Sequence, residues 1–234
     1  MFIELVGGSV CAAAGIVTYG VRSRSSGLFA PSVWRGVSHR RAIALTFDDG
    51  PSLATPQLLD LLARERVPAT FFQCGVNVLR LPGIARQVAG AGHEIGNHSH
   101  SHPRFYLRRA GFMEAEMRQA QAAIVETTGR APVLFRVPYG ARWFGLRGAQ
   151  KSLGLLGVMW TAIALDWKLS AAAIARRLLR AAVNGAIFCL HDGRQLEPRP
   201  AIGEMLEALR RLIPELRGRG FHFETVSQIL CPTN

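Results

Sequence analysis

Two adjacent carboxylates, Asp48 and Asp49, stand where an apolar run meets a Gly-Pro turn. The run 42–45 predicts a buried strand, and Gly50 with Pro51 predicts the turn that ends it. Because neighbouring carboxylates repel each other, they persist together mainly where positive charge lies beside them. A divalent metal ion is such a partner, so this pair predicts one edge of a metal site.

A cluster of histidines further along the chain offers the other ligands. His98 and His102 are four residues apart, a spacing that on a helical turn places both imidazoles on one side. Two histidines and one carboxylate are a common catalytic zinc set that leaves one position for water. His100, two residues from each, should point elsewhere, and we interpret it as a surface or rim residue.

The elements that would position these groups alternate between strand and helix beyond residue 41. Apolar runs predict strands at 42–47, 67–74, 93–97, 133–137, 155–165 and 186–190, with a last strand beginning at 221. Helical patterns lie between them at 55–66, 82–92, 108–128, 146–153, 170–183 and 202–217, the last carrying Pro214 as a flaw. About seven such units predict an α/β fold with a mostly parallel sheet and outer helices. Closure into a barrel is the leading prediction, and a doubly wound open sheet is the alternative.

Polar candidates follow the ends of the predicted strands. In a parallel barrel, the chemistry gathers at the carboxyl ends of the strands. Each candidate alone has an ordinary structural interpretation, but their meeting at one rim is hard to explain without a site. The candidates are Asp48, Asp49, His98, Arg136, Asp166, His191 and Asp192.

These residues carry the pattern of a known family. The chain resembles the polysaccharide deacetylases of carbohydrate esterase family 4, which share the NodB homology domain. The resemblance covers about 41–229, and it implies a distorted (β/α)7-type barrel. Five motifs occur in family order: Thr46-Phe47-Asp48-Asp49-Gly50-Pro51, His98-Ser99-His100-Ser101-His102, Arg136-Val137-Pro138-Tyr139-Gly140, Asp166-Trp167 and Leu190-His191-Asp192.

The resemblance implies a metal site and a catalytic base. Asp49, His98 and His102 would bind a divalent metal ion, most often Zn²⁺, with Co²⁺ and Fe²⁺ as alternatives. Asp48 would be the catalytic base, and Arg136 would keep it ionised and oriented.

The resemblance also implies a catalytic acid and a substrate pocket. His191 would be the acid, with Asp166 as its partner. The backbone N–H of Tyr139 would donate to the oxyanion, and Trp167 and Leu190 would form walls of the acetyl pocket.

The function implied is that of a metal-dependent hydrolase that removes N-acetyl groups from amino-sugar residues of a glycan. A deformylase or deacetylase of a lipid-linked amino sugar is the near alternative, and a non-catalytic glycan-binding protein is the alternative of another class. Ile163 departs from the pattern, since many members carry an acid there. The compact domain favours a short or lipid-linked sugar over a long insoluble polymer.

Composition agrees with one sizeable domain. The chain has 234 residues, 49% of them hydrophobic, and a formal net charge of +12. This positive charge favours anionic surroundings such as lipid headgroups or acidic envelope polymers. No basic cluster is interleaved with aromatic residues, so nucleic acid is not expected as a partner. The four cysteines show no CxxC pair and indicate no compartment, and the sequence indicates no oligomeric state.

The amino end suggests a location. We expect three parts: a hydrophobic segment at 1–22 that is a membrane anchor or a signal, a linker at 23–40, and the deacetylase-like domain at 41–231. The chain is therefore expected at a membrane or in the cell envelope. Arginines after the hydrophobic segment would hold the domain in the cytoplasm by the positive-inside rule, whereas an enzyme of cell-wall polymers should face outward.

Overall fold

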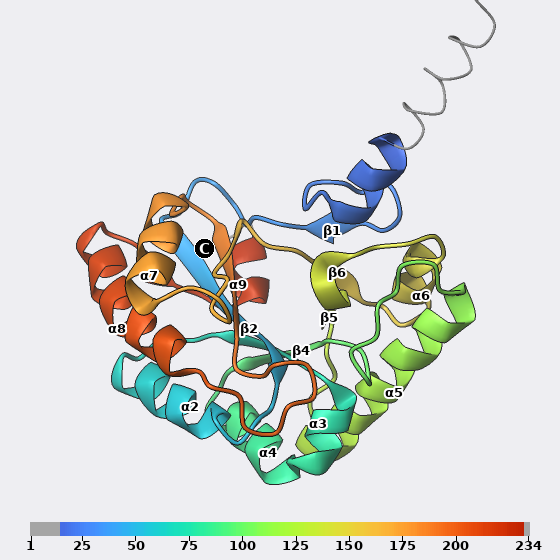
Figure 1. Cartoon of the computed structure of the whole chain (residues 1–234), viewed down its shortest axis with the longest axis horizontal. Coiled ribbons are helices and arrows are strands. Elements are labelled where there is room, and N and C mark those ends of the chain that lie inside the picture. Colours follow the sequence, from blue (N-terminus) through green and yellow to red (C-terminus); the bar gives the residue numbers. More distant parts are fainter. Residues whose placement is uncertain (1–14, 232–234) are drawn as a thin grey trace, which may run out of the picture.

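A curved parallel sheet forms the centre of the protein (Figure 1). The structure is a computed structural model and describes residues 15–231. The order within the sheet is β1-β6-β5-β4-β3-β2-β8-β7, with β9 paired to β2, and all these pairs are parallel. The strands are β1 (Ser32–Val33), β2 (Ala42–Gly50), β3 (Thr70–Gln73), β4 (Glu94–Asn97), β5 (Leu134–Phe135), β6 (Leu156–Val158), β7 (Ala162–Ile163), β8 (Ala186–His191) and β9 (His222–Phe223).

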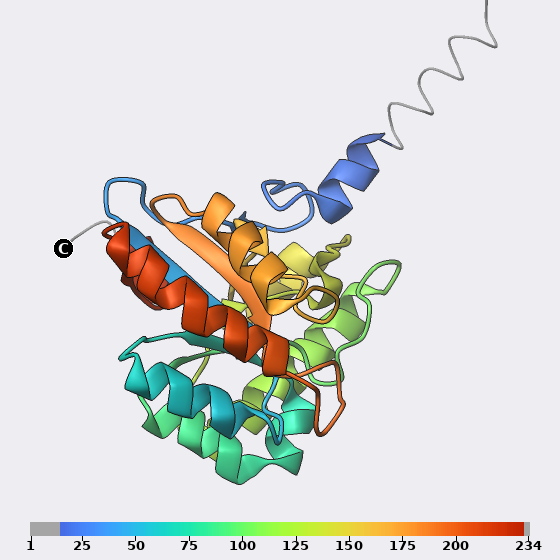
Figure 2. The same ribbon diagram turned by 60° about the vertical axis from the view of Figure 1, so that its left-hand side comes forward.

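Helices cover the outer face of this sheet. Figures 1 and 2 show α7 and α8 side by side on one flank and α2 to α6 around the other. Proline near the first turn opens α2 and α4, and Gly129 in the left-handed conformation ends α5. The helices are α2 (Thr55–Arg64), α3 (Gly75–Arg80), α4 (Pro82–Gly90), α5 (Ala110–Thr128), α6 (Leu146–Ser152), α7 (Ala171–Arg180), α8 (Gly203–Gly218) and α9 (Val226–Leu230). The predicted parallel α/β sheet with outer helices is therefore confirmed.

The two ends of the sheet do not pair as regular strands. An isolated antiparallel bridge joins Arg35, just after β1, to Ala186 in β8. The backbone N–H of Gly36 also donates to the carbonyl oxygen of Gly185 at 2.8 Å. The sheet is thus an incompletely closed barrel, in which an irregular segment takes the place of a closing strand.

Alternation along β2 explains how both faces of the sheet are filled. All nine residues of β2 are buried. Ile43, Leu45 and Phe47 belong to the cluster that packs against the outer helices, whereas Ala42 and Ala44 belong to a smaller inner cluster. Small side chains inside the sheet leave room for larger groups from the other strands.

Two predicted strands were wrong in extent. The run 155–165 forms two short strands, because β6 pairs with β5 and β1 whereas β7 pairs with β8, so the chain changes neighbours between them. The segment from 221 forms β9 and then helix α9, which a capping box between Thr225 and Gln228 begins. Helix α3 was not predicted, and α8 continues through Pro214.

The amino-terminal part of the described chain packs on the barrel. Residues 23–40, expected to be a linker, contain β1, which pairs with β6. The buried guanidinium of Arg142 donates to the carbonyl oxygens of Ser23 and Ser26. The expected hydrophobic segment 1–22 lies mostly outside the described residues. Its described part, residues 15–22, is helical. Between residues 15 and 231, no helix is both long and apolar enough to span a membrane.

Candidate active site

The predicted polar residues gather around one cavity at the carboxyl ends of the strands. The cavity has a volume of about 520 Å³. Of the residues predicted from sequence, its lining includes Asp48, Asp49, His98, His102, Tyr139, Asp166, Trp167 and His191. Arg136 lies beneath the cavity, fully buried, and Leu190 does not line it.

Asp49, His98 and His102 converge on one point. The Nε2 atoms of His98 and His102 lie 3.2 Å and 3.0 Å from Oδ1 of Asp49, and all three residues are buried. Their three ligand atoms lie within 4.8 Å of one another. Oδ1 of Asp49 is buried and has no hydrogen-bond partner within the described part of the chain. A buried carboxylate oxygen facing two imidazole nitrogens fits a divalent metal ion.

Neighbouring groups orient Asp49 and His98. The backbone N–H of Gln195 donates to Oδ2 of Asp49 at 2.6 Å, which leaves Oδ1 directed at the histidines. Nδ1 of His98 lies 2.7 Å from the carbonyl oxygen of Arg136, so this nitrogen carries the proton and Nε2 keeps its lone pair. Such outer contacts fix the tautomer that a metal ligand requires.

The histidine motif is a loop, so the predicted helical turn was wrong. Ser99 and His102 have φ values of 66° and 54°, which no α-helix accommodates. Glu116 of α5 stabilises this strained loop, because its carboxylate accepts the backbone N–H groups of His100 and Ser101 at 3.0 Å and 2.8 Å. The loop therefore directs His98 and His102 to one carboxylate, and His100 does not join the group.

The electrostatics of Asp49 agree with a ligand role. Burial alone would raise the pKa of its carboxyl. The imidazoles of His102 and His98 beside Oδ1 outweigh burial and hold the pKa of this carboxyl well below its usual range. Asp49 is therefore an anion at neutral pH.

Asp48 is paired with a buried guanidinium. Nη1 of Arg136 lies 2.7 Å from Oδ1 of Asp48, and the exposed fraction of Arg136 is 0%. Arg136 is itself held by the hydroxyl of Thr46 at 2.6 Å and by the carbonyl oxygen of Met159 at 3.1 Å. Two adjacent carboxylates are thus stabilised separately, Asp48 by an arginine and Asp49 by two histidines.

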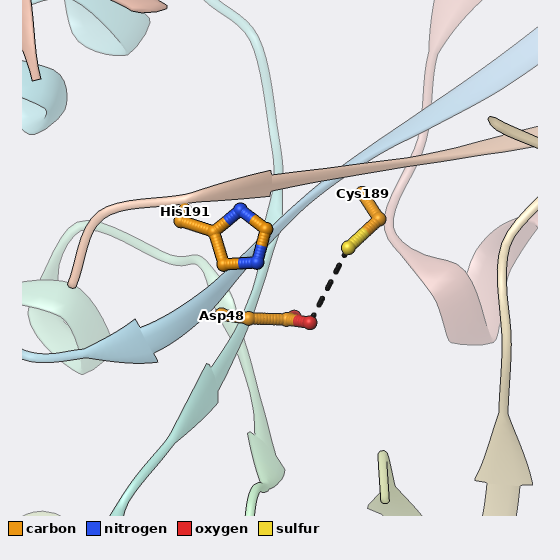
Figure 3. Close-up of side chains that lie close together, drawn as sticks. All are labelled: Asp48, Cys189 and His191. Atoms are coloured by element: carbon orange, nitrogen blue, oxygen red, sulfur yellow. Dashed lines mark hydrogen bonds between the residues drawn. The ribbon is translucent and has the colours of Figure 1, made fainter. Parts of the chain in front are cut away.

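The structure adds a thiol that the sequence did not assign to the site. Sγ of Cys189 lies 3.3 Å from Oδ2 of Asp48, with His191 beside them (Figure 3). Burial raises the pKa of the Cys189 thiol well above its usual range, and the charge of Asp48 adds to this effect. These three side chains are close enough to hold a metal ion, but Asp48 is already paired with Arg136 and His191 with Asp166. The Asp49 group is therefore the better candidate for holding a metal ion, and the Cys189 thiol donates a hydrogen bond to Asp48.

His191 and Asp166 form the second ion pair of the site. Nδ1 of His191 lies 2.9 Å from Oδ1 of Asp166, and the backbone N–H of His191 donates to Oδ2 at 2.8 Å. Burial lowers the pKa of His191, but the hydrogen bond and charge of Asp166 outweigh it and raise the pKa to about 9. His191 is therefore a cation at neutral pH and can donate a proton from Nε2.

Aromatic side chains border the cavity. The ring of Tyr139 packs against His102 at a centroid distance of 4.6 Å, in a backbone turn where Tyr139 has a φ of 57°. The indole of Trp167 meets His191 edge-on at 4.9 Å and is 46% exposed. Both rings are placed where a sugar could contact them.

The predicted pocket role of Leu190 was wrong. Leu190 is fully buried and packs in the outer core cluster with Phe188. Because side chains alternate along a strand, Leu190 and His191 of β8 face opposite sides, and Cys189 shares the side of His191. Counting two residues back from His191 would have identified Cys189 from the sequence.

Asp192, the last of the predicted candidates, does not line the cavity. It is fully buried, and the hydroxyl of Thr55 donates to its Oδ2 at 2.6 Å. Burial raises its pKa to about 7. A Cβ atom at Gly50 would come within 2.2 Å of this carboxyl, so only glycine allows the close approach.

Comparisons with known proteins agree with this geometry. The family model described as polysaccharide deacetylase matches residues 35–158. A chitooligosaccharide deacetylase of Bradyrhizobium sp. (strain ANU 289) is 35% identical, over 82% of this chain and 92% of that protein. The peptidoglycan-N-acetylglucosamine deacetylase PgdA of Listeria monocytogenes is 32% identical over 85% of this chain, which spans only 41% of PgdA. The solved structure of the Bc1960 peptidoglycan N-acetylglucosamine deacetylase superposes with a TM-score of 0.80 at 31% identity, covering 85% of this chain and 92% of that one. The chain therefore belongs to the polysaccharide deacetylase family.

Proposed function

We propose that this protein is a metal-dependent hydrolase that removes N-acetyl groups from amino-sugar residues of a glycan. The observation that carries this proposal is that Asp48, the Asp49, His98 and His102 group and the His191–Asp166 pair line one cavity, while Arg136 contacts Asp48 from beneath it. Amide hydrolysis needs an activated water, a base and an acid for the departing amine. The names of the relatives point to N-acetylglucosamine units as the substrate.

Each side chain has a role in this proposal. Asp49, His98 and His102 would hold a divalent ion, which when bound would supply Lewis acidity by lowering the pKa of water and polarising the amide carbonyl. Asp48, oriented by its contact with Arg136, accepts the proton of the attacking water. His191 donates its Nε2 proton to the amide nitrogen as the C–N bond breaks, and Asp166 stabilises its cationic form.

The remaining predicted residues bind the acyl group and the sugar. The backbone N–H of Tyr139 is proposed to stabilise the developing oxyanion, and one such donor contributes about 3 kcal/mol in other enzymes. Trp167 is proposed to stack on the sugar beside His191. Zn²⁺ is the proposed metal, because two imidazoles and a carboxylate suit it, although Co²⁺ and Fe²⁺ share these preferences.

Product release tests the function. The full chain, supplied with Zn²⁺, should release acetate from N-acetylglucosamine oligomers, and a chelator should abolish the release. Asp48→Asn should retain the metal and lose activity, so unchanged turnover in that variant would refute the base assignment. Formate from an N-formyl sugar with no acetate release would favour a deformylase. Glycan binding without either product would make the protein a non-catalytic binder.

We also propose that the protein acts at a membrane or in the cell envelope. The support is the hydrophobic composition of residues 5–21, which precede the domain. A fusion of the carboxyl end to reporters that work on one side of the membrane would reveal sidedness. Recovery of the full chain from the soluble cytoplasmic fraction alone would contradict the proposal.

A further inference from the structure

A second groove adjoins the catalytic cavity. It has a volume of about 650 Å³ and lies between the segment that carries Arg24 and Trp34, strand β7 and helix α7. Trp160 and Ile163 line both the groove and the catalytic cavity. The groove and the catalytic cavity therefore adjoin at these two residues.

Helix α7 presents a stripe of arginines to this groove. Arg176, Arg177 and Arg180 line it together with Ala173 and Ala181, which follow the spacing of one helix face. The opposite face of α7 packs into the core and includes Ile174 and Leu178. Small alanines between the arginines leave the groove open to a ligand.

The charge of this groove is unbalanced. Its lining contains four arginines, namely Arg24, Arg176, Arg177 and Arg180, and no aspartate or glutamate. Within residues 15–231, none of the four makes an ion pair. Like charges at these helical spacings destabilise a helix by about 0.2–0.5 kcal/mol per pair. The helix dipole stabilises Arg177 and Arg180 in the last turn of α7. It does not account for Arg24, which comes from a different segment.

Part of the groove is already held in position. Nε of Arg177 donates to the carbonyl oxygen of Ile163 at 2.7 Å. Arg24 donates to the carbonyl oxygen of Thr161 and lies 5.4 Å from the ring centroid of Trp34. Arg22, at the catalytic cavity, continues the positive charge towards the site. Fixed guanidinium groups bind an anion with little further loss of conformational freedom.

We propose that this groove binds a phosphate group attached to the substrate, so that the acceptor is an amino sugar linked through a phosphodiester. The inference rests on the proposed deacetylase function. Several guanidinium groups match the oxygens of a phosphate through bidentate hydrogen bonds, which they cannot form with a neutral glycan. The phosphate could belong to a lipid carrier or to a soluble glycosyl ester, and the chemistry recognised is the same.

Substrates that differ only in the phosphate test the proposal. The full chain with Zn²⁺ should hydrolyse N-acetylglucosamine 1-(ethyl phosphate) with a kcat/KM at least about tenfold above that of ethyl N-acetylglucosaminide. The difference should shrink as salt rises from about 0.05 M to about 0.5 M, because salt screens exposed charges. Equal kcat/KM values for the two substrates would overturn the proposal.

A double variant on α7 separates the groove from the catalytic residues. Arg176→Gln with Arg180→Gln should raise KM for the phosphodiester about fivefold to tenfold, leave its kcat within about twofold, and leave the neutral glycoside unaffected. The matched control, Arg64→Gln with Arg86→Gln, removes the same charge from exposed positions on α2 and α4. An equal loss with both substrates, or an equal loss in the control, would overturn the proposal.

Two further measurements test the source of the phosphate and its binding to the groove. A higher kcat/KM for a decyl phosphodiester in neutral-lipid vesicles than for the ethyl ester would indicate a lipid carrier. Equal kcat/KM values for the two esters would indicate a soluble ester. A preference for the decyl ester that the α7 variant does not reduce would overturn the proposal. Calorimetric binding of glucosamine 1-(ethyl phosphate) to the full chain, weakened by the α7 variant, tests the groove independently of turnover. Thus loss of turnover on every substrate refutes the proposed function alone. Absence of glucosamine 1-(ethyl phosphate) binding refutes the proposed phosphate site in the groove.

Discussion

The Cys189 thiol donates a hydrogen bond to Oδ2 of Asp48, the carboxylate oxygen that faces away from Arg136. Asp48 is thereby held at both oxygens, by a guanidinium on one and by a thiol on the other. A base that is held at both oxygens loses less rotational freedom when it accepts a proton from water.

Changing Cys189 should therefore affect turnover. Cys189→Ala removes one hydrogen bond, of about 0.5–1.5 kcal/mol, and should lower kcat about threefold to tenfold with little change in KM. Cys189→Ser keeps a donor and should restore most of the rate. Steady-state kinetics checks this, with Cys231→Ser, an exposed thiol, as control. Equal kcat in the alanine and serine variants would contradict the donor role.

Arg136 should be as important for stability as for catalysis. Arg136→Met leaves the carboxyl group of Asp48 buried without its partner, and breaking a buried ion pair costs about 3–5 kcal/mol. Urea denaturation monitored by circular dichroism measures the free energy of unfolding. The control is Arg118→Met, whose pair with Glu114 is exposed on α5 and should leave the unfolding midpoint nearly unchanged. Similar midpoints for the two variants would show that the buried pair is not required for stability.

The pH dependence should reflect His191. Its pKa is raised to about 9, so the proton is present below that pH and lost above it, and kcat/KM should fall on the alkaline side near pH 9. Asp166→Asn removes the hydrogen bond and charge that raise the pKa, so the alkaline limb should move towards lower pH. Profiles of kcat/KM against pH for both proteins test this. An alkaline limb that stays in place would assign it to another group.

Metal binding should depend on His102 and not on His100. Added Zn²⁺ should raise the melting temperature of the wild-type chain, because a ligand at 100 times its Kd stabilises the folded state by about 2.7 kcal/mol. His102→Ala should lose most of this shift and bind less metal by elemental analysis. His100→Ala is the matched control, since His100 lies in the same loop but outside the ligand group. Loss of metal in both variants would indicate that the loop, and not the ligand, had been disrupted.

Much of the site could be predicted because its residues directly follow the predicted strands along the chain. Asp48, Asp49, His98, Arg136, Asp166 and His191 follow predicted strands, and parallel strands bring their carboxyl ends together. Strand pattern and topology alone therefore place these groups at one rim.

What could not be predicted depended on backbone detail. The left-handed residues Ser99 and His102 form a loop where the spacing suggested a helix, and Glu116, which is distant in sequence, holds the two residues between them. The division of 155–165 into β6 and β7 follows from a change of strand neighbour that no local pattern encodes. The alternation of side chains along β8, by contrast, is visible in the sequence. It would have placed Cys189, and not Leu190, on the side of the strand that His191 faces.

The buried guanidinium of Arg142 sets a lower limit on how short a working domain can be. Its acceptors are the carbonyl oxygens of Ser23 and Ser26, so a truncation starting at Gly27 would leave a charged group buried with neither acceptor. The same truncation would delete Arg22 from the catalytic cavity and Arg24 from the adjoining groove. The amino-terminal segment is thus a wall of the binding site, and expression boundaries for this protein belong upstream of Arg22.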